Sequence, residues 1–227
     1  MSKRSPQTKQ LSPPAKSINW LVIGGVVVVG VVSLFLLLIL TVKPTPVLAL
    51  PDYCQVYPDR CVSSGVEDAP VTILEVFDFG CPHCRDFHEE TWSLLEQSYV
   101  AQAQVNWVVL PYALSADRIP AAASALCAQE QDAYFPYTKA LFTGFDLADN
   151  LTVVGFQRAA AATNLNLNSF NQCLAEGRYQ DVIRDNIEAA SQIGVNSTPT
   201  FFINGQKLKG NLPLAQFQQQ IENWLNR

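Results

Sequence analysis

Hydrophobic and polar positions divide the chain into an apolar run near the N-terminus and a longer part in which apolar residues recur at strand and helix intervals. Residues 21–40 are nearly all Val, Leu, Ile, Phe and Gly, and no charged residue occurs between Lys16 and Lys43. About 20 such residues in an α-helix span a bilayer core of about 30 Å. The pattern therefore predicts a transmembrane helix within residues 20–42.

The charges that flank this run predict its orientation. Basic residues are concentrated before it and sparse after it: Lys3, Arg4, Lys9 and Lys16 precede it, and Lys43 follows it. Because positive charges stay on the cytoplasmic side, we expect a single-pass protein of the cell membrane with a cytoplasmic N-terminus and an extracytoplasmic domain. Residues 1–19, rich in Ser, Pro, Lys and Gln, are predicted to be a disordered cytoplasmic tail.

A cleaved signal peptide is the alternative interpretation of the same run. Val47-Leu48-Ala49 offers small residues near a suitable cleavage position. Against this, the apolar core of a signal peptide is only about 7–15 residues long. The longer run favours an uncleaved anchor.

The remainder of the chain is acidic. All 20 acidic residues lie at or after Asp52, and the chain as a whole has a formal charge of -5. A domain of this charge offers no basic face for nucleic acid. The 227 residues, 48% of them hydrophobic, suffice for one domain with a substantial core in addition to the anchor.

The pattern after residue 70 is typical of an α/β domain. Residues 71–79 form an apolar run of the kind found in buried strands, apolar positions at helical spacing follow over residues 82–99, and residues 104–110 form a second strand-like run. A strand, a crossover helix and a second strand make a βαβ unit, which builds a parallel sheet.

The C-terminal half of the domain continues this pattern. From about residue 116 to 193, Leu and Phe recur at helical intervals among Ala, Gln and Asn, which predicts a helical insertion. Asn204-Gly205 between two strand-like runs predicts a β-hairpin, and residues 213–225 predict a final amphipathic helix. We therefore expect a linker and N-terminal extension over residues 43–70 and one α/β domain over residues 71–227.

Cys81 and Cys84 are the candidate catalytic residues. They form a C-x-x-C motif where the first predicted strand gives way to a helix. Free N–H groups and the dipole at a helix N-terminus favour a thiolate, so Cys81 is the predicted nucleophile and Cys84 the resolving thiol. A purely structural disulfide between them would add little, because the loop is so short. A zinc site is a further alternative, with its remaining ligands drawn from His83, His88, Cys54 and Cys61.

The other four cysteines are candidates for structural disulfides, since an extracytoplasmic location is oxidising. Cys54 and Cys61 are close enough in sequence to close a small local loop; the alternative is two unrelated thiols. Cys127 and Cys173 fall in two different predicted helices of the insertion. They are expected either to join those helices by a disulfide or to act as small apolar core residues.

The order of these elements resembles the DsbA-like thiol–disulfide oxidoreductases of the thioredoxin superfamily, specifically their membrane-anchored type. The most specific motifs are Cys81-Pro82-His83-Cys84 and VNSTPTFFING at residues 195–205. The likeness covers residues 71–227 and implies a thioredoxin-like α/β fold with a helical insertion. It also implies that Cys127 and Cys173 are paired, because cysteines so placed pair in anchored members of the family.

The resemblance assigns further roles around the cysteines. It implies that Pro199 is in the cis form beside them, and that the backbone of Thr198 pairs with a substrate strand, with Pro82 also on the substrate-binding surface. From the residues alone, Pro199 could merely open an edge strand. The resemblance further implies that His83 and the helix N-terminus stabilise the Cys81 thiolate, and with it the reduced form.

Glu75 interrupts the otherwise apolar first strand and matches the acidic residue that the family keeps beneath its active site. A buried carboxylate could accept or relay the proton of Cys84; the alternative is an acid exposed at a sheet edge. The chain departs from the family at His88, which stands four residues after Cys84 where the best-known members carry a second acid. Proton handling is therefore expected to differ here.

These observations predict a membrane-anchored extracytoplasmic dithiol oxidase that needs neither a cofactor nor a metal. By resemblance, it would pass its disulfide to exported proteins with free thiols and be reoxidised by a DsbB-like or vitamin-K-epoxide-reductase-like membrane partner. A disulfide reductase or isomerase of the same fold is the first rival. A thioredoxin-like binding module without catalysis is the second.

Overall fold

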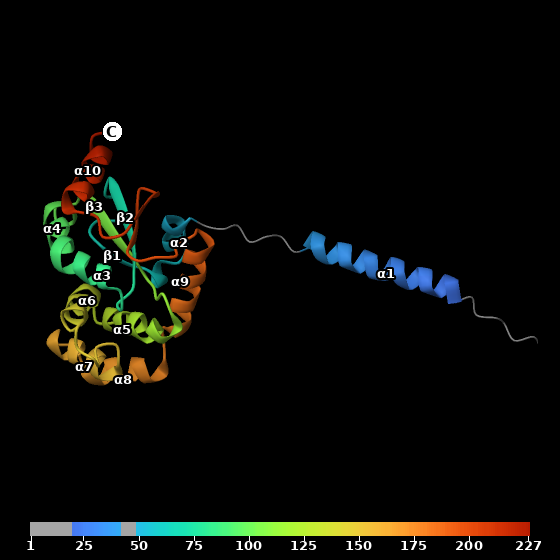
Figure 1. Ribbon diagram of the computed structural model, residues 1–227, viewed down its shortest axis with the longest axis horizontal. Helices are drawn as coiled ribbons and strands as arrows, with labels where there is room; N and C mark the ends of the chain where they lie inside the picture. The colour runs from blue at the N-terminus through green and yellow to red at the C-terminus, as the bar shows by residue number, and fades with distance from the viewer. Residues whose placement is uncertain (1–19, 42–48) are drawn as a thin grey trace, which may run out of the picture. The chain divides into compact units, whose positions relative to one another are not determined.

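The computed structural model describes residues 20–41 and 49–227. It consists of two units, Met1–Pro46 and Val47–Arg227, and each is considered by itself (Figure 1). In the first, α1 (Trp20–Thr41) is a helix of 22 residues. Among the described residues, no helix meets both the length and the apolarity that a membrane span requires. The anchor thus stays a prediction from the sequence, and the predicted cytoplasmic tail and the start of the predicted linker lie outside the described residues.

The second unit is built around a five-stranded sheet with the order β1-β3-β2-β4-β5. The strands are β1 (Val62–Ser64), β2 (Val71–Phe77), β3 (Val105–Pro111), β4 (Thr200–Ile203) and β5 (Gln206–Lys209). β2 and β3 are parallel, as the βαβ pattern predicts, and the other neighbouring pairs are antiparallel. The predicted hairpin at Asn204-Gly205 joins β4 and β5.

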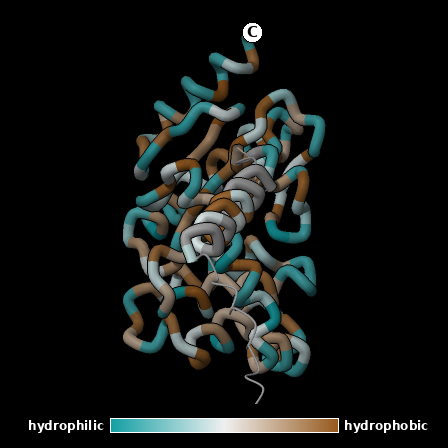
Figure 2. The backbone as a smooth tube through the Cα atoms, turned by 90° about the vertical axis from the view of Figure 1, so that its right-hand side faces the viewer, coloured by the Kyte–Doolittle hydropathy of each residue, from teal (hydrophilic) through white to brown (hydrophobic). Residues whose placement is uncertain are grey.

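Helices surround this sheet. Before β2 come α2 (Leu50–Val56) and the short η1 (Pro58–Arg60); after it come α3 (Pro82–Phe87), η2 (His88–Trp92), α4 (Ser93–Leu95) and η3 (Glu96–Val100). The insertion comprises η4 (Ala116–Arg118), α5 (Ile119–Gln129), α6 (Tyr134–Thr143), α7 (Val153–Ala162), α8 (Leu167–Glu176) and α9 (Gln180–Gln192). The final helix is α10 (Leu214–Leu225), whose hydropathy alternates along the tube towards the C-terminus in Figure 2. The α/β fold with a helical insertion is therefore confirmed.

The helix after the C-x-x-C motif is less regular than its sequence pattern predicts. Residues 82–100 are helical throughout, but η2 and η3 are π-helical. Such wide turns are uncommon and occur mostly as short bulges within α-helices, often at functional sites. The η2 bulge begins at His88, one turn beyond Cys84.

The sheet is buried on both faces, which explains the continuous apolar run of β2. On one face, alternate strand residues such as Ile73 and Trp107 pack in the main core with α3 and α10. On the other, Leu74 and Val76 pack with α2 and α9, and Figure 1 shows these two helices side by side.

The N-terminal extension is more ordered than its turn-rich sequence suggests. Leu50 is fully buried, and β1 pairs with β3 to form one edge of the sheet. The Tyr53 hydroxyl donates a hydrogen bond of 3.0 Å to Asn186 Oδ1 in α9, and the Asn186 amide donates to the carbonyls of Arg60 and Pro111. Residues 49–70 are therefore part of the domain rather than only a linker.

Two disulfides reinforce this architecture. Cys54 and Cys61 join the end of α2 to the residue before β1. Cys127 in α5 and Cys173 in α8 are joined across 46 positions of sequence, and both are buried. The second bond fixes two helices of the insertion to each other.

The two disulfides are expected to contribute unequally to stability. Because loop-closure entropy grows with loop length, the bond that spans 46 positions should stabilise by roughly 1.5–2 kcal/mol more than the bond that spans 7. Chemical denaturation of the Cys127→Ala/Cys173→Ala and Cys54→Ala/Cys61→Ala double variants measures the difference. An equal or larger loss for the second variant would contradict this expectation.

Candidate active site

The cysteine pair lies where β2 passes into α3. β2 ends at Phe77, a turn follows, and Cys81 is the N-cap residue of α3, with extended backbone angles. The Cys81 N–H donates to the Asp78 carbonyl at 3.0 Å, which holds the turn closed. Both Cys81 and Cys84 are unpaired thiols in this structure, and they lie beyond the carboxyl end of a parallel strand, as the βαβ pattern predicts.

The structure favours a thiolate at Cys81. Its pKa is lowered to about 5, first by a hydrogen bond from the Cys84 thiol, which outweighs the opposing effect of burial. The Thr198 side chain and the backbone N–H groups of Cys84 and His83 lower the pKa further. These N–H groups belong to the first turn of the helix, and the Cys84 N–H also donates to the Cys81 carbonyl at 3.1 Å.

Cys84 has the opposite character. It is completely buried, whereas Cys81 keeps 7% of its surface exposed. Burial raises the pKa of the Cys84 thiol well above its usual value, and the neighbouring Cys81 raises it further. The pair thus combines one accessible thiolate with one protonated thiol that can donate a hydrogen bond to it.

The Thr198-Pro199 segment completes the site from a distant part of the chain. The peptide bond between Thr198 and Pro199 is cis, and the Cys81 thiol lies 3.4 Å from the Thr198 carbonyl, to which it can donate. The Thr198 hydroxyl is buried and has no hydrogen-bond partner among the described residues, so it is free to donate to the Cys81 thiolate. The CPHC motif and the Thr198-Pro199 segment therefore lie next to each other, as the resemblance implies.

Glu75 is fully buried beneath this region rather than exposed at a sheet edge. Its Oε2 accepts a hydrogen bond of 3.0 Å from the Trp107 indole N–H. Its Oε1 lies 2.9 Å from His88 Nε2. The two residues that the sequence separates by 13 positions are therefore direct partners.

Asp78 is a site residue that the sequence analysis missed. It is fully buried, and its carboxylate accepts hydrogen bonds from the backbone N–H groups of Gly80 and Leu114 at 2.6 Å and from Arg118 at 3.0 Å. A Cβ atom at Gly80 would lie only 2.7 Å from Arg118 Nε, so glycine allows the guanidinium to cover the turn. The position of Asp78, three residues before Cys81, was the available signal in the sequence.

Pro82 and His83 are exposed beside the thiols, where an incoming protein can contact them. The candidate zinc ligands are not brought together: Cys54 and Cys61 are bonded to each other, and His88 is turned to Glu75. Within the described ranges, no group of three or more His, Cys, Asp or Glu side chains is arranged to hold a metal ion.

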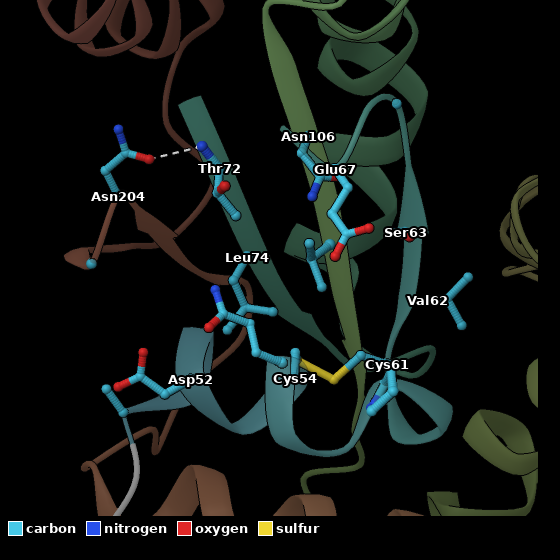
Figure 3. Close-up of a pocket in the computed structure, with 16 residues that line it drawn as sticks. Asp52, Cys54, Cys61, Val62, Ser63, Glu67, Thr72, Leu74, Asn106 and Asn204 are labelled. Carbon is cyan, nitrogen blue, oxygen red and sulfur yellow. Dashed lines mark hydrogen bonds between the residues drawn. A yellow bond between two sulfur atoms is a disulfide. The ribbon is translucent and has the colours of Figure 1, made fainter. Parts of the chain in front are cut away.

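A cavity of about 830 Å³ lies elsewhere, against the sheet beside the Cys54–Cys61 disulfide (Figure 3). Its lining combines polar and apolar side chains, among them Glu67, Thr72, Leu74, Asn106 and Asn204. At its rim, Asn204 Oδ1 accepts a hydrogen bond of 2.7 Å from the Thr72 N–H. The residues that line it in the described part of the chain do not include the CPHC cysteines.

The fold and the cysteine pair define a thioredoxin-type protein. The family model described as Thioredoxin matches residues 59–223, and the chain belongs to that family. The match begins in the N-terminal extension and runs nearly to the end of α10.

Solved structures show which thioredoxin-type proteins the chain resembles. The crystal structure of Wolbachia pipientis α-DsbA1 superposes with a TM-score of 0.65 at 26% identity, over 72% of this chain and 90% of that one. BdbD from Bacillus subtilis superposes with a TM-score of 0.66 at 17% identity, over 73% of this chain and 92% of that one. The resemblance to DsbA-like thiol–disulfide oxidoreductases is therefore confirmed.

Curated relatives add a second observation. The chain is 33% identical over 161 residues to a Na⁺/H⁺ antiporter, NhaA 3, of Salinispora tropica, covering 67% of this chain but 23% of that protein. It is 20% identical over 167 residues to disulfide bond formation protein D of Bacillus subtilis, covering 71% and 75% respectively. The chain thus spans about a quarter of the length of the antiporter relatives.

The thiolate at Cys81 should be visible in its pH profile. In the reduced protein, alkylation of Cys81 by iodoacetamide is expected to be half-maximal near pH 5, whereas a free cysteine requires about pH 8.5. Because the folded-state pKa is depressed, the stabilisation of the reduced form is present above the unfolded pKa and is lost as pH falls through about 5. A midpoint at or above about pH 8 would contradict the proposed environment, and Cys81→Ser supplies the background rate.

Proposed function

We propose that the chain is an extracytoplasmic dithiol oxidase that introduces disulfides into exported proteins through a Cys81–Cys84 disulfide. The observation that carries the proposal is the contrast between the two thiols: the Cys81 pKa is lowered to about 5, and the pKa of the buried Cys84 is raised. This difference in pKa between the two thiols stabilises the reduced, dithiol form, because Cys81 is then a thiolate. Its disulfide is therefore a strong acceptor of electrons.

The reaction begins with the oxidised protein. A substrate thiolate attacks Cys81 Sγ, the bond between the two active-site sulfurs breaks, and Cys84 leaves as a thiolate that takes up a proton. A second substrate thiolate then attacks the substrate sulfur of the mixed disulfide, and Cys81 leaves as a stable thiolate. The substrate loses two electrons, and the cysteine pair gains them.

Other residues of the site are assigned supporting roles in this proposal. Thr198 offers its backbone to the substrate strand and its hydroxyl to the Cys81 thiolate, and Pro199 holds that segment against the cysteines. Pro82 and His83 form part of the exposed contact surface. Glu75 exchanges protons on behalf of Cys84. The reaction as written requires no cofactor.

The location and the partners belong to the same proposal. The uncharged residues 21–40 and the basic residues before them support a single-pass anchor with an extracytoplasmic domain. The reduced form must return its two electrons to an oxidant, and a membrane oxidant, DsbB-like or vitamin-K-epoxide-reductase-like, suits an anchored enzyme. The names of the DsbA and disulfide bond formation protein D relatives agree with this assignment.

Trapping of mixed disulfides tests the roles of the two cysteines. In cells that express Cys84→Ala, exported proteins should accumulate as mixed disulfides with Cys81, because the resolving thiol is missing. Cys81→Ala should trap none, since the buried Cys84 is inaccessible. Equal trapping by both variants, or by neither, would refute the assignment.

The direction of the reaction is tested by the reduction potential. Equilibration of the purified protein with glutathione buffers should give a potential more oxidising than the value of about −270 mV that is typical of thioredoxin. A potential near that value, with both cysteines reduced in the cell, would make the chain a reductase. If the thiols exchange with neither glutathione nor substrate, the chain would be a binding module without catalysis.

The anchor and its orientation are tested by proteolysis. Protease added outside intact spheroplasts should digest the domain after residue 50 and spare the segment before residue 20. Protection of the C-terminus would refute the orientation. A mature chain that begins at Leu50 would replace the anchor by a signal peptide.

A further inference from the structure

The turn between β2 and α3 is organised by one buried side chain. Asp78, directly after β2, has no exposed surface. Its Oδ1 accepts hydrogen bonds from the Gly80 N–H at 2.6 Å and from Arg118 Nη1 at 3.0 Å. Its Oδ2 accepts one from the Leu114 N–H at 2.6 Å. Hydrogen bonds to a charged acceptor are shorter and stronger than neutral ones, so the carboxylate holds all of these donors in place.

The donors come from two separate segments of the chain. Gly80 belongs to the turn that leads into the cysteines, whereas Leu114 and Arg118 belong to the segment that follows β3. Arg118 also covers the turn, because a Cβ atom at Gly80 would lie within 3.0 Å of three atoms of its side chain. The Asp78 carboxylate therefore ties the CPHC turn to the neighbouring part of the sheet.

The backbone of Asp78 reaches both cysteines. Its carbonyl accepts a hydrogen bond of 3.0 Å from the Cys81 N–H. Burial raises the pKa of the Cys84 thiol well above its usual value and Cys81 raises it further, whereas a hydrogen bond from the Asp78 backbone lowers it. One residue thus contacts the cysteine at each end of the redox pair through its main chain.

Thiol–disulfide exchange makes use of such contacts. When a substrate thiolate attacks Cys81, Cys84 leaves as a thiolate, and it does so without exposed surface. Fixed hydrogen-bond donors, aimed at the atom on which charge develops, stabilise such a species most effectively. The Asp78 N–H is a donor of this kind, provided that the turn stays in place while the two sulfurs separate.

We propose that Asp78 is the positioning residue of the redox pair: its carboxylate fixes the turn, so that its own backbone keeps Cys81 and Cys84 in place while the bond between them breaks and forms. This inference rests on the proposed oxidoreductase function and deepens it. The carboxylate itself exchanges neither electrons nor protons with the sulfurs. Arg118 balances its charge and closes the turn on the outer side.

The other charged and titratable groups of this region do not replace Asp78. Tyr112, directly after β3, has its pKa raised by burial and further by the Asp78 carboxylate, so its phenol stays neutral. Asp86 of α3 pairs with Arg85 at 2.7 Å and is partly exposed. Arg118 is thus the cation that contacts the Asp78 carboxylate.

Asp78→Asn tests the inference because it separates position from charge. Asparagine has the size of aspartate, but an amide donor replaces one acceptor oxygen. It therefore cannot accept from both the Gly80 and the Leu114 N–H groups, which bond to different oxygens. The loosened turn should misalign the groups that stabilise the Cys81 thiolate and raise the Cys81 pKa. Removal of a negative charge alone would lower that pKa.

The measurement is the pH profile of Cys81 alkylation by iodoacetamide in the reduced full-length chain. The midpoint is expected near pH 5 in the unaltered protein, and at least about one pH unit higher in Asp78→Asn. At about pH 7, the equilibrium with glutathione should also shift towards the disulfide form. The shift is about tenfold for each unit by which the pKa rises, because a less stable thiolate destabilises the reduced form.

Asp86→Asn is the matched control. Asp86 lies two residues after Cys84, and its substitution removes a negative charge near the cysteines without altering the turn. Because exposed charges interact weakly, its midpoint should agree with that of the unaltered protein within about 0.3 pH unit.

Gly80→Ala perturbs the same turn and leaves every charge in place. Its Cβ atom should displace the Arg118 side chain, and the midpoint should rise in the same direction as in Asp78→Asn. Far-ultraviolet circular dichroism verifies the fold of each variant. Gly80→Ala carries the test if Asp78→Asn does not fold.

The inference and the proposed function fail in different ways. Suppose that the unaltered protein titrates near pH 5 and that folded Asp78→Asn, or Gly80→Ala in its place, has an equal or lower midpoint. The positioning role of Asp78 would then be wrong, and the oxidoreductase proposal would stand. The profile of an ordinary thiol in the unaltered protein would instead refute the activated Cys81, and with it the proposed function.

Discussion

The difference in environment between two sulfur atoms one helical turn apart is the feature on which the rest of the site depends. Cys81 is the N-cap residue of α3, and the first-turn N–H groups of Cys84 and His83 help to lower its pKa. Cys84, three residues later, faces the core with no exposed surface. The fold produces this contrast because β2 is buried on both faces and is followed directly by α3. The first residue of the helix lies near the protein surface, and the next turn faces the interior. The carboxyl end of β2 is where that transition falls.

Hydrogen bonds stabilise the two buried acidic residues near the cysteine pair. Asp78 satisfies two backbone N–H groups and a guanidinium at the turn, and Glu75 satisfies an indole and an imidazole in the core. An ionisable group in such a place destabilises a protein unless it is fully hydrogen-bonded. Both acids meet that condition, so the interior can hold charge close to the reacting sulfurs without losing the fold.

Much of this could be predicted from the sequence, and the reasons for success and failure are physical. The βαβ unit, the hairpin at Asn204-Gly205 and the CPHC turn have strong local signals, because alternation, glycine and cysteine spacing act over a few residues. β1 was not predicted, since a three-residue edge strand is specified by its partner β3 rather than by its own pattern. The contact of His88 with Glu75 could not be predicted, because it depends on how η2 packs on the sheet. Asp78 was overlooked because two of its three partners, Leu114 and Arg118, lie far along the chain.

The two disulfides must form while each new copy of the protein folds. Before the domain is complete, a new copy must give up four electrons, two from Cys54 and Cys61 and two from Cys127 and Cys173. The first pair closes across seven positions and can be oxidised early, whereas the second joins segments 46 positions apart and waits for much of the insertion to emerge. Each molecule thus requires the same disulfide formation that it is proposed to catalyse. A cell that begins with no mature copies must form the disulfides of the first copies with another oxidant.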